Sequence, residues 1–155
     1  MSVEIPPPSF VDTNIWVYAI AGDDPRRSAV AQDLVRGLME AQALRTSTQV
    51  LQELYVTLTR KVRTPLEPAR ALRYMDQIAA WPVVAPDYGA VRDAVELSTT
   101  ASLSLWDALI VVAAARSGAT RLYSEDMQDG QKILGLTIVD PFRETSGGGQ
   151  GESER

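Results

Sequence analysis

The strongest constraint on the fold is an alternation between short strand-forming runs and longer segments whose apolar residues recur at helical spacing. Strands are predicted at residues 9–11, 43–46, 83–85, 121–123 and 136–139. Helices are predicted between them, at residues 14–21, 26–40, 48–62, 69–80, 88–98 and 105–115. Strands that alternate with helices are typical of a parallel sheet covered by helices on both faces, so the sequence predicts an α/β fold.

The chain has 155 residues, a length typical of one domain with its own core. From residue 145 onward the composition changes to Gly, Ser, Gln and Glu, which cannot bury enough apolar surface to become ordered. We therefore predict one domain over residues 1–144 and a disordered tail over residues 145–155. No segment is apolar enough to span a bilayer and residues 1–4 lack the basic start of a secretory signal, so we expect a cytoplasmic protein with no membrane contact.

Two residue types are absent from the sequence, and their absence narrows the chemistry. With no Cys and no His, the chain cannot supply a Cys/His zinc site, a Cys nucleophile, a Ser-His-Asp triad or a His general base. Carboxylates, hydroxyls, Lys, Arg, Tyr or a metal ion held by oxygen atoms are left. The net charge of −5 disfavours non-specific binding to nucleic acid, unless divalent cations cover the acids of the site.

Two acids follow predicted strands, at the sheet edge where functional groups collect in α/β folds. Asp12 comes directly after the strand at 9–11, and Asp126 comes shortly after the strand at 121–123. The two carboxylates would lie side by side if these strands are neighbours in the sheet. The alternative for each acid is that it only caps the start of a following helix.

A third acid, Asp107, is unusual because no other charged residue occurs between Glu96 and Arg116. Its helix is apolar nearly all round and is therefore expected to be buried. A buried carboxylate needs a partner, a metal ion or a capping role. The capping role stays open, because Ser104 and Asp107 have the spacing of a capping box.

The sequence resembles the PIN-domain family of metal-dependent ribonucleases, and specifically the VapC-type toxins of VapBC toxin–antitoxin pairs. That family has Asp-Thr-Asn at the end of the first strand, a Glu on an early helix, an Asp at the start of a late apolar helix, and Thr/Ser-x-Asp after the next strand. The corresponding residues are Asp12-Thr13-Asn14, Glu53, Asp107 and Ser124-Glu125-Asp126. The match spans residues 9–142 and implies a three-layer α/β/α sandwich with a central, mainly parallel sheet.

The resemblance implies an acidic metal site made of Asp12, Glu53, Asp107 and Asp126. Glu53 enters only in this way, because a lone Glu on the polar face of a helix is usually solvated. Oxygen-only ligands favour Mg²⁺ or Mn²⁺, and we expect one or two ions. Thr13, Asn14 and Ser124 would position a carboxylate, a water molecule or a phosphate oxygen.

The function implied is that of an endoribonuclease toxin that cleaves RNA with a metal-activated water. A VapB-like antitoxin would be its partner and would place a basic side chain among the acids, and homodimers are common in the family. The residues also suggest contacts to the RNA backbone, although such a charge run is more often a solvated face. The candidates are Arg60, Lys61, Arg63, Arg70 and Arg73.

Two other functions remain open at this stage. One is a degenerate PIN domain that acts only as an interaction module, which the presence of all four acids disfavours. The other is a phosphotransferase or receiver domain with a phosphate-accepting Asp at the end of the first strand. Receivers require a late Lys at a strand end, whereas Lys132, the only late Lys, is predicted to lie in a helix.

Overall fold

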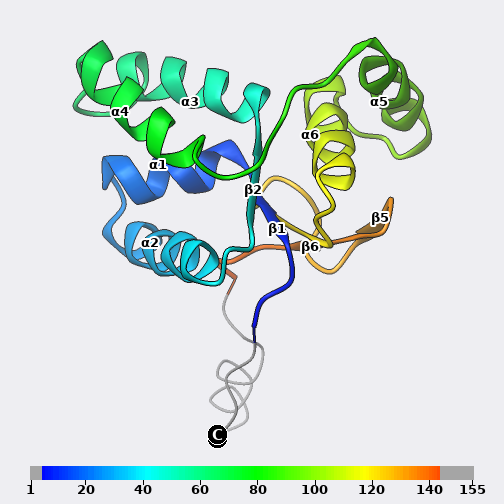
Figure 1. Cartoon of the computed structure of the whole chain (residues 1–155), viewed down its shortest axis with the longest axis horizontal. Coiled ribbons are helices and arrows are strands. Elements are labelled where there is room, and N and C mark those ends of the chain that lie inside the picture. Colours follow the sequence, from blue (N-terminus) through cyan, green and yellow to red (C-terminus); the bar gives the residue numbers. More distant parts are fainter. Residues whose placement is uncertain (1–4, 144–155) are drawn as a thin grey trace, which may run out of the picture.

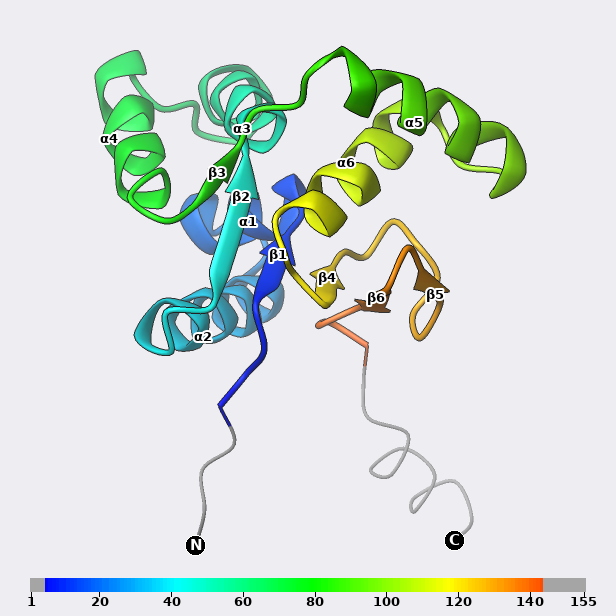
Figure 2. The same ribbon diagram turned by 45° about the vertical axis from the view of Figure 1, so that its right-hand side comes forward.

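The computed structural model describes residues 5–143, which form a six-stranded sheet flanked by helices. The strands lie in the order β3-β2-β1-β4-β6-β5 (Figure 2). Their bounds are Ser9–Val11 (β1), Leu44–Ser47 (β2), Val83–Val84 (β3), Arg121–Tyr123 (β4), Lys132–Ile133 (β5) and Leu136–Val139 (β6). The predicted tail at residues 145–155 lies outside the described residues.

The helices cover both faces of the sheet, which gives three layers (Figure 1). Helices α1, α2, α3 and α4 lie on one side, and α5 and α6 lie on the other. Their bounds are Thr13–Ala21 (α1), Pro25–Glu40 (α2), Thr48–Arg60 (α3), Pro68–Ile78 (α4), Tyr88–Thr100 (α5) and Leu105–Arg116 (α6). The predicted α/β/α sandwich is confirmed, and the strands and helices predicted by residue range are all present, with bounds shifted by two residues or fewer.

Strand β1 lies at the centre of the sheet and pairs in parallel with both β2 and β4. In the register of the β1–β4 pair, Val11 lies opposite Tyr123, and the backbone amide of Asp12 donates to the carbonyl of Tyr123 at 3.0 Å. The residues that follow the two strands therefore leave the sheet side by side. The two strands are therefore neighbours, which is the condition under which Asp12 and Asp126 were expected to lie at the same edge of the sheet.

One prediction was wrong. Lys132 is not helical but lies in β5, which pairs antiparallel with β6 through a tight turn. The two turn residues, Leu134 and Gly135, both have positive φ, at 51° and 81°. A two-residue loop of this kind matches the twist of an antiparallel hairpin. The strand was missed because its two residues carry no periodic signal and because Leu at a positive-φ position is not a recognisable turn residue.

The core joins the central strands to the helices and fixes where the strand ends lie. Phe10, Leu44, Leu122 and Ile138, from four adjacent strands, are all 1% exposed or less. Helix α6 buries residues around most of its circumference, as its composition predicts. Among residues 5–143, no helix has the length and apolar character needed to cross a membrane.

Candidate active site

Asp12 begins the site, because it directly follows β1 and forms the N-cap of α1. Its Oδ1 accepts a hydrogen bond from the Thr13 amide at 2.7 Å, and its Oδ2 accepts one from the Ser124 hydroxyl at 2.9 Å. The side chain is nearly buried, with 6% of the residue exposed. Asp12 therefore caps the helix with one oxygen, as the simpler interpretation predicts, and binds the end of β4 with the other.

Burial raises the pKa of Asp12 to about 6. The hydrogen bonds from Thr13 and Ser124 oppose this increase, and the negative charges of Asp126 and Asp107 add to it. A carboxylate surrounded by few water molecules and by other acids is costly to ionise. The carboxyls that the sequence suggested separately are thus electrostatically coupled in the fold.

Asp126 lies on the loop after β4, beside Asp12. Its Oδ2 accepts a hydrogen bond from the Asn14 side-chain amide at 3.1 Å, and its backbone amide donates to the Ser124 hydroxyl at 3.2 Å. The Ser124 hydroxyl therefore links the two acids, since it donates to Asp12 and accepts from the Asp126 backbone. Burial raises the pKa of Asp126, and the charges of Asp107 and Glu125 raise it further.

Glu53 reaches the same edge from α3. Its Oε1 accepts a hydrogen bond from the Thr13 hydroxyl at 2.8 Å, and its Oε2 accepts one from the Gln49 side-chain amide at 3.1 Å. Gln49 also donates to the backbone carbonyl of Trp106 at 3.3 Å, which ties α3 to the start of α6. Glu53 is half-buried and held from two sides, so it does not have the geometry of an ordinary solvated Glu.

Asp107 lies in the first turn of α6, where its backbone amide donates a hydrogen bond to the Ser104 hydroxyl at 3.0 Å. The reciprocal bond of a full capping box, from the Ser104 amide to the Asp107 carboxylate, is not formed among the described residues. Burial raises the pKa of Asp107, the Ser104 side chain lowers it, and the charge of Glu53 raises it. The carboxylate thus adds its charge to the same cluster.

The four acids have the chemistry of a cation site, although their side chains are not arranged around a common point. Within residues 5–143, no three carboxylates lie close enough together to enclose an ion. Each of Asp12, Glu53 and Asp126 is instead held by a neutral donor, and no Lys or Arg of the described part forms an ion pair with any of the four. Oxygen donors with uncompensated negative charge suit a hard divalent cation.

Two further acids near the loop have other partners. Glu125 accepts hydrogen bonds from the Tyr18 hydroxyl at 2.5 Å and from Nε of Arg27 at 3.3 Å. Burial and Glu125 raise the pKa of Tyr18 to about 12. Asp129 accepts the backbone amide of Asp140 at 2.8 Å, which fixes the end of β6. Both carboxylates are occupied away from the four acids.

Sequence reasoning missed three residues that hold the site: Gln49, Tyr18 and Arg27. Gln49 lies four residues before Glu53 on the same helix face, a spacing that does suggest a contact. Tyr18 and Arg27 contact Glu125 across about 100 residues of sequence, and no local pattern signals that contact. Arg27 also stacks over the rings of Tyr18 and Phe142, at 5.6 and 5.4 Å from their centres.

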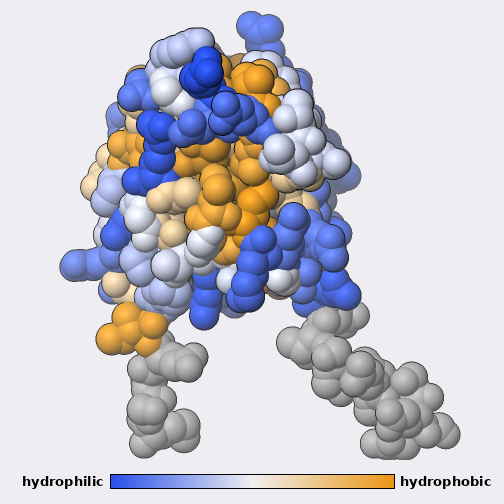
Figure 3. Space-filling view, turned by 90° about the vertical axis from the view of Figure 1, so that its right-hand side faces the viewer, coloured by the Kyte–Doolittle hydropathy of each residue, from blue (hydrophilic) through white to orange (hydrophobic). Residues whose placement is uncertain are grey.

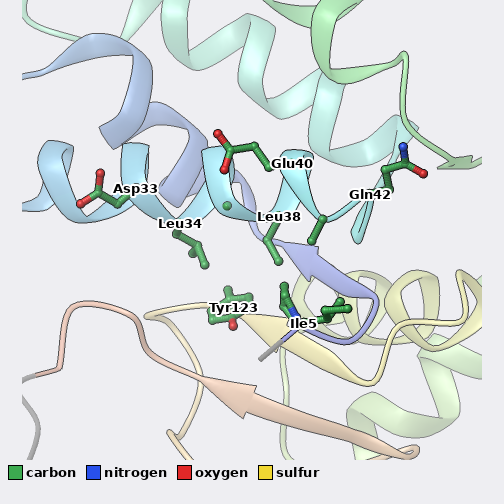
Figure 4. A pocket seen from close by; sticks show the side chains of 10 residues that line it. Ile5, Asp33, Leu34, Leu38, Glu40, Gln42 and Tyr123 are labelled. Atoms are coloured by element: carbon green, nitrogen blue, oxygen red, sulfur yellow. The ribbon is translucent and has the colours of Figure 1, made fainter. Parts of the chain in front are cut away.

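One cavity of the described residues lies apart from the acidic site. It has a volume of about 710 Å³ and is lined by residues of α2, the N-terminal segment and Tyr123 (Figure 4). None of the four acids lines it. A smaller groove of about 400 Å³ does reach the site, and Thr13, Asn14 and Glu53 are among its lining residues.

Asp12 and Asp126 thus lie at the carboxyl ends of two central strands of an α/β/α sandwich, the edge where functional groups collect in α/β folds. The PIN-domain family model matches residues 9–128. A curated relative, Ribonuclease VapC23 of Mycobacterium tuberculosis, is 33% identical over 121 residues, which cover 76% of this chain and 91% of the relative. The chain therefore belongs to the PIN-domain family, and to the VapC group within it.

Two solved structures share the fold. One is VapC20 of Mycobacterium tuberculosis, described as a Sarcin-Ricin loop cleaving toxin, with a TM-score of 0.58 and 22% identity over 75% of this chain and 88% of that one. The other is a toxin–antitoxin complex from Klebsiella pneumoniae, with a TM-score of 0.60 and 18% identity over 86% of this chain and 97% of that one. At these identities the likeness concerns the fold.

The raised pKa of Asp12 predicts a pH-dependent cost to folding. Between its ordinary value of 3.8 and about 6, the folded protein keeps a proton that the unfolded chain has released, so this group makes the free energy of unfolding fall as pH rises through that range. In buffer with EDTA, Asp12→Asn should be more stable than the parent chain above pH 6, by at most about 3 kcal/mol. Urea denaturation at several pH values measures this difference. The difference in the free energy of unfolding between the two proteins should vanish near pH 3.5. A difference that does not depend on pH would contradict a raised pKa of Asp12.

The Tyr18–Glu125 contact predicts a stability effect of a single hydroxyl. Tyr18→Phe keeps the ring but removes the hydrogen bond to a carboxylate, and should lower the free energy of unfolding by about 2 kcal/mol. Tyr88→Phe is the matched control, because Tyr88 is 74% exposed and its change should stay within about 0.5 kcal/mol. Equal effects of the two substitutions in urea denaturation would refute a specific role for the Tyr18 hydroxyl.

Proposed function

We propose that this protein is a divalent-metal-dependent endoribonuclease that acts as the toxin of a type II toxin–antitoxin pair. The observation that carries the proposal is the gathering of Asp12, Glu53, Asp107 and Asp126 at one sheet edge with no basic side chain of residues 5–143 to neutralise them. Membership of the VapC group supports the choice of RNA as substrate. The absence of His from the sequence agrees with a mechanism that needs no His base.

The four carboxylates would hold one or two Mg²⁺ or Mn²⁺ ions. A bound ion of this kind lowers the pKa of a water molecule and stabilises the charge that builds on an attacked phosphate. The raised pKa values of Asp12, Asp107 and Asp126 support this role. Burial is their main cause and neighbouring carboxylates add to it, and a bound cation would stabilise the ionised forms against both effects.

The neutral side chains around the acids have separate roles in this proposal. The Ser124 hydroxyl holds Asp12 and the Asp126 backbone in one geometry, and the Thr13 hydroxyl holds Glu53. Asn14 donates to Asp126 with one amide hydrogen, which leaves its other amide hydrogen for a water molecule or a phosphate oxygen. These three residues orient the acids and exclude alternative side-chain positions.

A nuclease assay with matched variants tests the proposal. Purified protein should cleave RNA in the presence of Mg²⁺ or Mn²⁺ and not in EDTA, and Asp12→Asn and Asp107→Asn should each reduce the rate roughly 100-fold or more. Asp33→Asn removes the same charge from an exposed site on α2, where Asp33 forms an ion pair with Arg36, and should leave the rate unchanged. Unimpaired cleavage by the Asp12 and Asp107 variants would refute the assignment.

We also propose two protein partners. The first is a VapB-like antitoxin, supported by the VapC relatives and by the toxin–antitoxin complex that shares the fold. The second is another copy of the chain. An apolar patch on the face over α5 and α6 (Figure 3) supports a homodimer, and there Leu97, Val112, Ala115 and Leu134 line a cavity of about 600 Å³.

The antitoxin proposal predicts co-purification. When the neighbouring reading frame is co-expressed, a small protein should elute with this chain in size-exclusion chromatography, and cleavage of RNA by the complex should be inhibited because the partner supplies a cation to the acids. The Asp12→Asn variant should retain the partner through the rest of the interface. Elution of the chain without any small partner would argue against the toxin role.

A further inference from the structure

The segment from Arg60 to Arg73 carries an excess of positive charge in an otherwise acidic chain. It contains five basic residues and one acid, whereas the whole chain has a net charge of −5. None of the five basic side chains has a carboxylate within 4.0 Å among residues 5–143. Their charges are therefore available to a ligand that carries negative charge.

The structure separates these basic residues into two places. Lys61, the C-cap residue of α3, lines the groove that reaches the acidic site. Arg70 and Arg73 of α4 line a different cavity of about 180 Å³ together with Tyr74 and Gln77. The sequence suggested all of them as RNA contacts, but only Lys61 lines the same groove as an acid of the site.

The side chains that line the groove change from acidic at Glu53 to basic at Lys61. The groove has a volume of about 400 Å³ and is lined by Thr13, Asn14, Gln52, Glu53, Val56, Thr57 and Lys61. Glu53 and Lys61 are eight residues apart on α3, which places them about 12 Å apart along the helix axis. Between them on α3, Thr57 and Val56 line the groove, and Val56 is 44% exposed.

A groove that is acidic at one end and basic at the other suits a single-stranded nucleic acid, whose backbone phosphates and unpaired bases are both exposed. One phosphate would lie at the acids, where a divalent cation offsets their charge, and a neighbouring phosphate would lie at the Lys61 ammonium. The Thr57 hydroxyl between them can bond to ribose or a base edge, and Val56 can contact an apolar surface.

We propose that this groove binds the single-stranded RNA segment next to the cleaved bond, and that Lys61 contacts a neighbouring phosphate. The inference rests on the proposed nuclease function and adds to it the path of the substrate. Lys61 is then a substrate-binding residue rather than a catalytic one. Arg70 and Arg73 lie outside the path.

Steady-state cleavage of a short unstructured RNA with Lys61→Ala and Arg73→Ala tests the path. Both residues are exposed and lack ion pairs in the described part of the chain, so neither substitution should impair folding. Lys61→Ala should raise KM about fivefold with a much smaller effect on kcat, and should lower the salt dependence of binding by about one unit of log–log slope. Arg73→Ala should change neither quantity, and Lys61→Arg should restore most of the affinity.

A binding experiment separates this inference from the proposed function. Fluorescence anisotropy with a labelled, unstructured RNA in Mg²⁺ uses the Asp12→Asn variant, with and without the additional Lys61→Ala change. If the parent chain cleaves no RNA, the proposed function fails, whereas weaker RNA binding on loss of Lys61 would still support the groove. If the parent chain cleaves RNA but the Lys61 and Arg73 substitutions have equal effects, or none, the proposed path is wrong. An effect of Lys61→Ala on antitoxin binding alone would also overturn it.

Discussion

The parallel pairing of β1 with β4 is the constraint on which the site depends. Because Val11 lies opposite Tyr123, the chain leaves both strands at the same height, and the Ser124 hydroxyl comes within 2.9 Å of Asp12. A shift of this register by one residue would turn the side chains of a strand to the other face and separate the two loops. The buried core around Phe10 and Leu122 fixes that register.

Repulsion between acids is the cost of this arrangement. Asp12, Asp107 and Asp126 all have raised pKa values, with burial as the main cause and neighbouring carboxylates as a further one. Each hydrogen bond from Thr13, Asn14 or Ser124 offsets part of that cost, but none supplies a positive charge. Stability of the fold and readiness of the site for a cation therefore oppose each other, which is common where function requires charge to be concentrated.

Two nearby acids, Glu125 and Asp129, are kept out of the acidic site because other residues hold their carboxylates. Glu125 lies between two site residues in sequence, yet Tyr18 and Arg27 bind its carboxylate, and Asp129 is used to hold the start of the turn after β6. The charge of Glu125 still raises the pKa of Asp126, but its carboxylate oxygens are held by Tyr18 and Arg27. The packed side chains Tyr18, Arg27 and Phe142 are linked to the loop of Asp126, because Tyr18 and Arg27 hold the adjacent residue, Glu125.

The sequence by itself determined the α/β class and nearly all the elements, and it suggested three of the four acids of the proposed site. Strand and helix periodicities are local, and Asp12, Asp107 and Asp126 each stand out against their own neighbours. Glu53 was assigned only through the resemblance to a family, because a polar residue on a helix face carries no local signal of a partner. The contact between Glu53 and Thr13 spans 40 residues, and it exists only because α1 packs against α3.

The tertiary structure alone decided which charges lie together. It brought Gln49, Tyr18 and Arg27 to the site, placed Lys132 in a hairpin strand, and distinguished Lys61 from the other basic residues of its segment. The physical reason is the same in each case. Side-chain contacts between elements depend on strand order and helix packing, which are set by the burial of the whole core rather than by any short stretch of sequence.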